Sequence, residues 1–261
     1  MLTPREHHAL RILVGEAIRR GEPPLLRVLL FGSKARGDFD ADSDIDALFL
    51  CDVHPDDRRH AARALHELAE LVVEETGVEI EPWAVPAADL ERGARTPMLV
   101  DALEDAVPLW PPGSPPLRLP FTPEDAAFCA DCLLQWVEDG GPIVRNALEA
   151  GEWAHAATRA RDDIARLATA LLLLEGDTRH RRTSSLRRFE ERFVRPRIVS
   201  PRVLAPLAWA TAAYPPNGGR GDQNPPVTAS AAFTAPLGYH LAAIMQRHVV
   251  PLILERLETA R

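Results

Sequence analysis

Apolar and polar residues follow two different patterns along this chain. In the first 110 residues, short runs with strand-like alternation are separated by stretches in which apolar residues recur at helical spacing. Thr3 followed by Pro4 is a typical helix start, and Gly21 and Gly77 are typical helix stops. We therefore predict strands at 27–31, 44–50 and 78–85 and an apolar end at 107–110, with helices at about 4–20 and 55–76 and a short helix before residue 107.

The rest of the chain has a helical pattern. Residues 111–116 read Pro-Pro-Gly-Ser-Pro-Pro, which continues neither a helix nor a strand and marks a domain boundary. Helices are predicted from 123, at 152–175, at 184–194, from 201 and at 237–257, with a Pro/Gly-rich loop at 214–236 and a kink or break at Pro251. The predicted architecture is an α+β N-terminal domain (1–110, a small mixed sheet with flanking helices), a Pro-rich linker (111–120) and an all-α helical bundle (121–261).

Composition and charge are those of an ordinary globular protein. Of the 261 residues, 46% are hydrophobic and 26% are charged, and the net charge of −8 argues against nucleic-acid binding by the whole surface. No apolar run is long enough to span a membrane, and charged residues interrupt the N-terminus, so we expect a cytoplasmic protein without membrane contact. The Cys129-x-x-Cys132 pair lacks further zinc ligands and predicts buried core.

Two short segments carry the candidate chemistry. The first reads Phe-Gly-Ser-Lys-Ala-Arg-Gly (31–37), and the second, at the start of the next predicted strand, reads Ser-Asp-Ile-Asp (43–46). Gly32 lets the backbone approach a phosphate closely, and Ser33 can cap a short helix whose free N–H groups favour anions. Arg36 can donate charge-assisted hydrogen bonds to phosphate oxygens. The pattern favours a phosphate-binding turn.

The second segment adds two carboxylates on one face of a strand. Side chains alternate between faces, so Asp44 and Asp46 project to the same side. Like charges repel, and Mg²⁺ prefers oxygen ligands from carboxylates and phosphates, so a divalent cation beside a nucleoside triphosphate is the favoured interpretation. The alternative is a plain strand-turn-strand connection with solvated aspartates.

Together these segments resemble the signature of the polymerase-β-type nucleotidyltransferases, in particular the minimal and antibiotic-modifying members, over about the first 110 residues. The resemblance implies a third acidic residue on a later strand, for which Glu79 is the first candidate and Glu81 the reserve. It also implies nucleotide contacts from Gly32, Ser33, Lys34, Arg36 and Ser43. Lys34 stands at a variable position of the motif, so a phosphate contact and a solvated turn residue are both open.

The resemblance implies a reaction as well. A nucleoside monophosphate would pass from an NTP, with ATP the first choice, to a hydroxyl acceptor in a two-metal mechanism with Mg²⁺ or Mn²⁺. Asp44, Asp46 and Glu79 would be the metal ligands, and Glu79 would alternatively accept the proton of the acceptor hydroxyl. The acceptor is open among a protein side chain, a tRNA end and a small molecule. A regulatory module that binds nucleotide without chemistry is a further alternative.

The helical half is similar, more diffusely, to the HEPN domains found beside minimal nucleotidyltransferases, which suggests subunit pairing through these helices. It lacks the spacing of arginine and histidine that the nuclease members carry. Arginines crowd residues 179–202, and Arg181, Arg182, Arg187 and Arg188 are candidates for contacts to RNA or DNA phosphates. A solvated helix face is the alternative. The competing function is a toxin-antitoxin-type fusion whose helical domain binds or cleaves nucleic acid.

Overall fold

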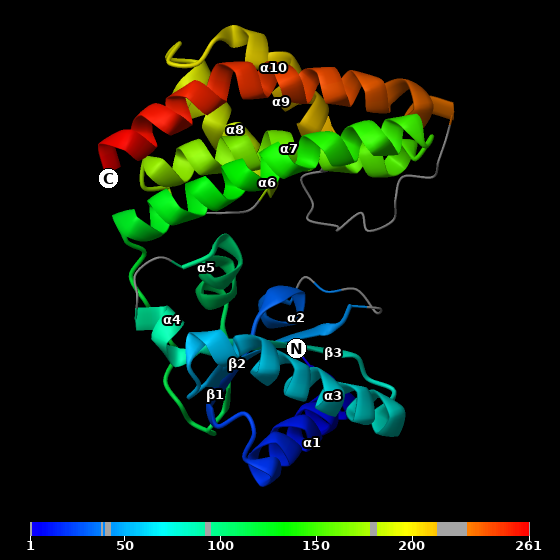
Figure 1. The fold of residues 1–261 in the computed structure, drawn as a ribbon, viewed down its shortest axis with the longest axis vertical. Helices are drawn as coiled ribbons and strands as arrows, with labels where there is room; N and C mark the ends of the chain where they lie inside the picture. Colours follow the sequence, from blue (N-terminus) through cyan, green and yellow to red (C-terminus); the bar gives the residue numbers. More distant parts are fainter. Residues whose placement is uncertain are drawn as a thin grey trace. The chain divides into compact units, whose positions relative to one another are not determined.

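The chain forms two compact units in the computed structural model, Met1–Pro120 and Phe121–Arg261. The structure describes residues 2–37, 39, 43–91, 95–177, 182–212 and 229–260. The first unit contains four strands and the helices around them, shown in Figure 1 from blue to green: α1 (Pro4–Arg20), β1 (Leu25–Leu30), α2 (Gly32–Arg36), β2 (Ile45–Cys51), a 3₁₀ turn (Pro55–Asp57), α3 (Arg58–Thr76), β3 (Ile80–Pro86), α4 (Ala87–Glu91), α5 (Pro97–Glu104) and β4 (Val107–Trp110).

The four strands form one mixed sheet in the order β3-β2-β1-β4. β1 runs antiparallel to β2 and β4, whereas β2 and β3 are parallel and joined by the crossover helix α3. The predicted mixed sheet with flanking helices is therefore confirmed. Its order makes β1 and β2 the central strands, so the turn between them starts from the middle of the sheet.

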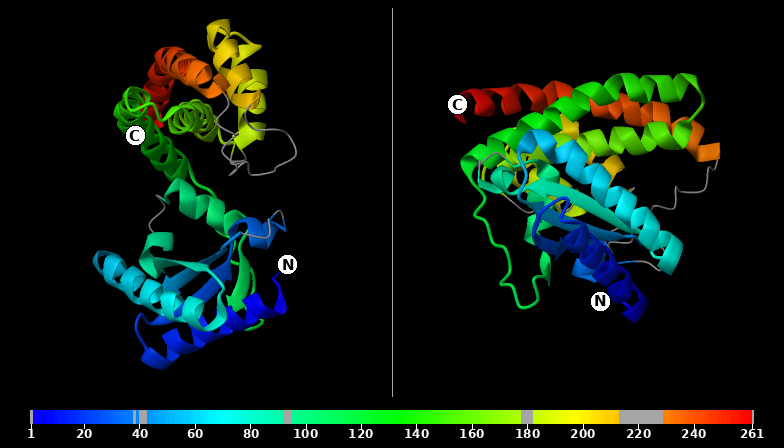
Figure 2. Two further views of the ribbon diagram at one scale, coloured as in Figure 1. Left: turned by 90° about the vertical axis from the view of Figure 1, so that its right-hand side faces the viewer. Right: turned by 60° about the horizontal axis from the view of Figure 1, so that its bottom comes forward.

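The two faces of the sheet are covered by different helices. Alternation along β2 sends Ile45, Ala47 and Phe49 into a core shared with α1 and α3. Leu48 and Leu50 point the other way, into a core with residues of α5. Figure 2 shows α1 and α3 on one side of the sheet and α5 on the other. Asp46, between Ala47 and Ile45 in the chain, is on the α5 face by the same alternation.

The helix boundaries follow local capping signals. Thr3 and Glu6 form a reciprocal capping box at the start of α1, and Gly21 and Gly77 end α1 and α3 in the left-handed conformation. The strand ends depart from the prediction by one to two residues. The parallel ladder starts at the pair Ile45 and Ile80, which leaves Asp44 and Glu79 immediately before their strands.

The predicted linker packs back on the first unit. Leu117 and Leu119 contact the core on the α5 face, and the Arg118 guanidinium donates to the Glu104 carbonyl at 3.0 Å. Arg27 similarly donates to the Pro115 carbonyl at 3.3 Å. Residues 111–120 therefore share the core of the sheet domain even though their proline content prevents regular structure.

The second unit is helical over the residues the structure describes, as predicted. It contains α6 (Pro123–Glu149), α7 (Trp153–Leu174), α8 (Arg182–Phe189), a π-helical turn (Glu190–Val194), a 3₁₀ turn (Pro201–Val203), α9 (Leu204–Ala212) and α10 (Ala229–Ala260). α7 packs extensively on both α6 and α10, and these three long helices run side by side in Figures 1 and 2. Its alanines 156, 157, 160, 165, 168 and 170 are buried, which brings the neighbouring helices close.

The last helix departs from the prediction. Residues 229–236, predicted as loop, belong to α10; the helix includes Pro236 and is not broken at Pro251, where a kink or a break was predicted. Each proline removes a helical hydrogen bond, but burial of Met245, Val249 and Ile253 keeps the flanking turns packed. The remainder of the predicted loop, 214–228, lies outside the described residues.

Two further observations concern the burial of the cysteines and the hydrophobicity of the helices. Cys129 is fully buried, which confirms the core prediction for it, while Cys132 is half-buried, and neither forms a disulfide. Burial in the sheet core raises the pKa of the Cys51 thiol to about 12. None of the helices among the described residues combines the length and apolar character needed to cross a bilayer.

Candidate functional site

The predicted phosphate turn connects the two central strands. Phe31 follows β1, and its N–H donates to the carbonyl of Asp46 at 3.1 Å. The chain then turns through the single helical turn α2 and leaves it at Gly37, whose φ is +83°. A backbone hydrogen bond therefore connects the start of the glycine-serine turn, residues 31–37, to the strand that carries Asp46.

Gly32 lies directly against the Asp46 carboxylate. Its φ is +72°, and a Cβ at this position would lie 1.9 Å from Asp46 Oδ2. No side chain larger than hydrogen fits there without moving the carboxylate. The glycine and the aspartate, which the sequence separates by a loop, thus form one site.

Ser33 is buried without a hydrogen bond. The residue is 1% exposed, and among the described residues its hydroxyl Oγ has no partner. The predicted capping role is wrong, because Phe31 occupies the cap position and makes no side-chain cap bond. An unpaired buried hydroxyl is unfavourable in a folded protein, so one at a predicted ligand site is a candidate for satisfaction by the ligand.

The acidic residues enter the site from two neighbouring strands. Asp46 is half-buried and directly beside Glu81 in the parallel register. Asp44 and Glu79 are exposed and precede β2 and β3, where the Ile45 N–H donates to the Glu79 carbonyl at 3.2 Å. The register therefore places Asp44 next to Glu79 and Asp46 next to Glu81.

These carboxylates are not arranged as a set of metal ligands in this structure. Within the part of the chain that the structure describes, no three histidine, cysteine or acidic side chains are grouped closely enough to hold a metal ion. Glu81 is engaged instead by His66 of α3, with Nε2 and Oε1 3.4 Å apart. Glu79 makes no side-chain hydrogen bond or ion pair with any residue described.

The two basic residues of the turn have carboxylate partners. Lys34 Nζ lies 2.6 Å from Glu6 Oε1, and its side chain is 3% exposed, so it is not a solvated turn residue. Arg36 Nη1 lies 3.3 Å from Asp105 Oδ2 at the end of α5. Ser43 is half-buried just before the acidic pair. Arg36 and Ser43 remain predicted nucleotide contacts.

Glu6 and Asp105 are contributors that the sequence reasoning missed. Both come from elements other than the motif, 28 and 69 residues from their basic partners. Glu6 had a visible role as the third residue of the α1 capping box, which gave no reason to connect it with Lys34. The sequence around Asp105 gave no indication that this residue would pair with Arg36.

In the second unit, the arginine-rich segment is largely ion-paired. Arg188 lies 2.9 Å from the 7% exposed Asp177 carboxylate, and Arg187 lies 3.0 Å from Glu191. Arg192 contacts Glu175, and Arg195 contacts Glu190. Arg182 is the first residue of α8, and Arg181 lies outside the described residues. The predicted excess of positive charge is therefore reduced by carboxylates inside and outside the segment.

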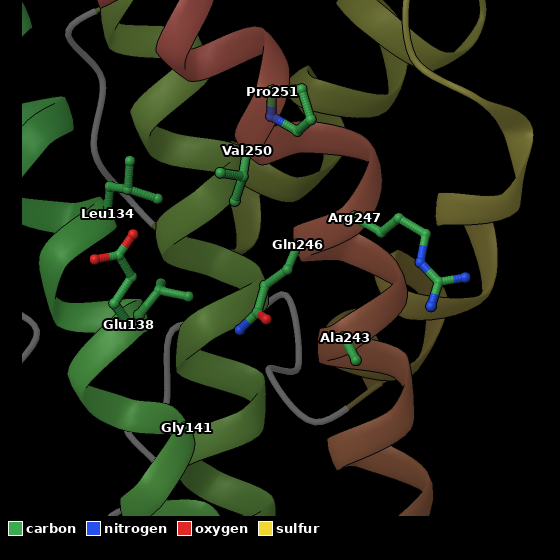
Figure 3. Close-up of a pocket in the computed structure, with 9 residues that line it drawn as sticks. Leu134, Glu138, Gly141, Ala243, Gln246, Arg247, Val250 and Pro251 are labelled. Carbon is green, nitrogen blue, oxygen red and sulfur yellow. The ribbon is translucent and has the colours of Figure 1, made fainter.

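A groove of about 500 Å³ lies between α6 and α10. Figure 3 shows Gln246 and Val250 of α10 directed toward Leu134 and Glu138 of α6. The groove is mostly apolar, and none of the predicted nucleotide-site residues lines it. We therefore locate the candidate site at the turn, where the motif chemistry is, and not at this hollow.

The first unit is thus a mixed sheet whose glycine-serine turn lies against the strand that carries Asp46. Residues 11–109 match the family model described as nucleotidyltransferase domain, so the chain carries a nucleotidyltransferase domain there. This confirms the predicted resemblance at the level of the domain, and the HEPN resemblance of the helices stays a prediction. No curated protein and no solved structure matches the chain.

Proposed function

We propose that the chain transfers a nucleoside monophosphate, AMP first, from an NTP to a hydroxyl acceptor in a reaction that depends on Mg²⁺ or Mn²⁺. The observation that carries the proposal is the contact between Gly32 and the Asp46 carboxylate. It brings the backbone of the glycine-serine turn and a carboxylate oxygen of Asp46 into one place. The match of residues 11–109 to a nucleotidyltransferase domain supports the same chemistry.

The residues present suit a divalent ion and a triphosphate. Their donors are carboxylate and hydroxyl oxygens, which Mg²⁺ and Mn²⁺ prefer. The buried Ser33 hydroxyl has no partner among the described residues and is available to donate to a phosphate oxygen, and the space beside Gly32 is filled by the Asp46 carboxylate, a group of the kind that binds divalent metals. Asp44, Asp46 and Glu79 would hold the metal, and they have to turn toward a common point to do so. When bound, the metal ions stabilise charge on the attacking and leaving oxygens of an in-line displacement.

Side chains and backbone groups of the chain itself would bind the phosphates and transfer the proton. The Ser33 hydroxyl and the turn backbone bind phosphate oxygens, Arg36 adds charge-assisted hydrogen bonds, and Ser43 is a further nucleotide contact. Glu79 either ligates the metal or takes the proton from the acceptor hydroxyl as that oxygen attacks the α-phosphorus. The bond from the α-phosphorus to the bridging oxygen breaks, and pyrophosphate leaves. Holding the reactants in line supplies much of the rate enhancement.

The test uses the full chain, each labelled NTP with Mg²⁺, and acceptors from a cell lysate. We expect label on an acceptor with the wild type and at least about a hundredfold less with Asp46→Asn. Asp52→Asn is the matched control, because Asp52 is exposed just beyond the far end of the same strand. Calorimetry of MgATP binding gives a second readout. A wild type inert with all four NTPs, or an Asp46→Asn variant as active as the wild type, would contradict the proposal.

A second pair of variants assigns the third carboxylate. The register places Glu81 beside Asp46, but Glu81 is engaged by His66 while Glu79 has no such partner among the residues described. We therefore propose Glu79 and expect Glu79→Gln to lose turnover about a hundredfold, with a much smaller loss in Glu81→Gln. The reverse order would assign the role to Glu81.

The toxin-antitoxin alternative gains no observation in its favour. Of its four candidate arginines, Arg187 and Arg188 are paired with carboxylates, and Arg188 is mostly buried. We therefore keep subunit pairing as the proposed role of the helical unit.

A further inference from the structure

Lys34 and Glu6 form the most buried ion pair among those that join separate elements of the first unit, counting only the residues described. Lys34 Nζ lies 2.6 Å from Glu6 Oε1, and the two side chains are 3% and 13% exposed. Lys34 belongs to the turn helix α2, whereas Glu6 belongs to the first turn of α1. The pair therefore connects the glycine-serine turn to a long helix on the opposite face of the sheet from α5.

Glu6 is itself held in place by the end of α1. Its second oxygen, Oε2, accepts the Thr3 N–H at 2.6 Å, and its own N–H donates to the Thr3 hydroxyl at 3.2 Å. Burial tends to raise the pKa of this carboxyl, but the hydrogen bonds from Lys34 and Thr3 outweigh it and the pKa is lowered. The carboxylate is thus a fixed, charged anchor for Lys34.

Lys34 also reaches the other side of the turn. Its Nζ lies 4.4 Å from the centroid of the Phe39 ring, within cation–π distance. Phe39 belongs to the connection that leads from the turn to Ser43 and Asp44. One ammonium group therefore contacts the end of α1 and the loop that leads to the acidic residues.

We propose that Lys34, anchored by Glu6, is a positioning residue that fixes the glycine-serine turn against Asp46 for nucleotide binding. The inference rests on the proposed function. It gives Lys34 a role other than the phosphate contact implied by the motif, because its ammonium group is already committed to Glu6 and Phe39. A neutral residue at either end of the pair would free the turn to move relative to Asp46. A displacement of about 1 Å in such a site is enough to lower turnover strongly.

The test compares Lys34→Met, Glu6→Gln, their double variant and Glu16→Gln in the full chain. The Glu6→Gln substitution keeps a side-chain oxygen that can accept the Thr3 N–H but removes the charge. Glu16 forms an exposed pair with Arg19 on the same helix and is the matched control. Two readouts are hydrogen exchange of the 32–37 amides, compared with that of α3, and the Kd and kcat for MgATP.

We expect each single variant to lose roughly tenfold in exchange protection at 32–37, with α3 unchanged, and to weaken MgATP binding about tenfold. Because the two residues act through each other, the double variant should lose no more than the worse single variant. Glu16→Gln should match the wild type. Additive losses, equal loosening of α3, or unchanged MgATP affinity would overturn the proposal. If the wild type binds no NTP, the proposed function fails, and positioning of the turn is then judged by the coupled exchange losses alone.

Discussion

The glycine-serine turn and the arginine-rich segment are both dense in polar residues, yet they differ in how those residues are satisfied. In the turn, Lys34 and Arg36 have carboxylate partners, but the Ser33 hydroxyl is buried without a partner among the described residues. In the helical unit, Arg187, Arg188, Arg192 and Arg195 each have a carboxylate nearby. Groups left unsatisfied point to a ligand, whereas charges that neutralise one another point to structure.

The difference shows that a cluster of polar residues in a sequence does not by itself indicate a binding site. Counting arginines at 179–202 overestimated the available charge, because Glu175 and Asp177 come from just outside the cluster. The interpretation of the turn motif has more structural support, because Gly32 has a steric role that no other residue can fill. Substitutions within each of the two regions test this comparison.

The largest effect is expected from Gly32→Ala. Its Cβ would displace the Asp46 carboxylate, so turnover and MgATP binding should both fall by at least about a hundredfold. Gly21→Ala is the control, because Gly21 has a similar positive φ with nothing within 4 Å of the added Cβ. It should cost about 1–2 kcal/mol of folding free energy and leave nucleotide binding unchanged. Equal effects of the two variants on MgATP affinity would refute the steric account.

In the helical unit, Arg188→Met should destabilise by about 3 kcal/mol, because it leaves the buried Asp177 carboxylate without its guanidinium. Arg187→Met, one residue earlier in an exposed pair with Glu191, should change stability by less than about 0.5 kcal/mol. Denaturant unfolding measures both. Binding of an RNA or DNA probe should be the same in both variants; selective loss in either would support the nucleic-acid alternative.

The two units should respond oppositely to pH. In α7, burial raises the pKa of Asp163 to about 6 despite Arg159 and Arg166 beside it. The folded state then retains a proton that the unfolded state loses above about 3.8, so stability from this group declines as pH rises from about 4 to 6, by roughly 2–3 kcal/mol in total. For Glu6 the folded pKa is lowered, so its contribution is present above its ordinary value and declines as pH falls.

Hydrogen exchange corrected for intrinsic rates, followed separately in α7 and α1 from about pH 3 to 7, measures this contrast. Asp163→Asn should remove the decline in α7 and leave α1 unaffected. A decline in α7 that persists in Asp163→Asn would show that another group is responsible.

The smallest effect is expected at Arg197, which follows the π-helical turn with a φ of +63°. This is an unfavourable conformation for a residue with a Cβ, so Arg197→Gly should raise stability by about 0.5–1 kcal/mol. Thermal unfolding checks the shift, with Arg195→Gly, in a residue of ordinary helical backbone, expected to destabilise instead. A loss of stability in Arg197→Gly would mean that this side chain contributes more than its backbone strain costs.

Much of the fold was predictable because its signals are local. Capping at Thr3 and the stops at Gly21 and Gly77 act within a few residues, and they were located correctly. The continuation of α10 through Pro236 and Pro251 was not, because burial against other helices outweighs the local cost of proline. For the candidate site, the motif supplied Gly32, Asp44 and Asp46; the structure places Gly32 against Asp46, and the roles of these residues stay predictions.

By itself, the sequence determined the sheet and helix order, the glycine-serine turn and the acidic pair, since backbone sterics and side-chain alternation act over short distances. Only the tertiary structure decided which charges meet. Lys34 contacts Glu6, Arg36 contacts Asp105, and Arg188 contacts Asp177. The physical reason is that such pairing depends on elements brought together by packing, and no local pattern records which distant carboxylate an arginine or lysine will find.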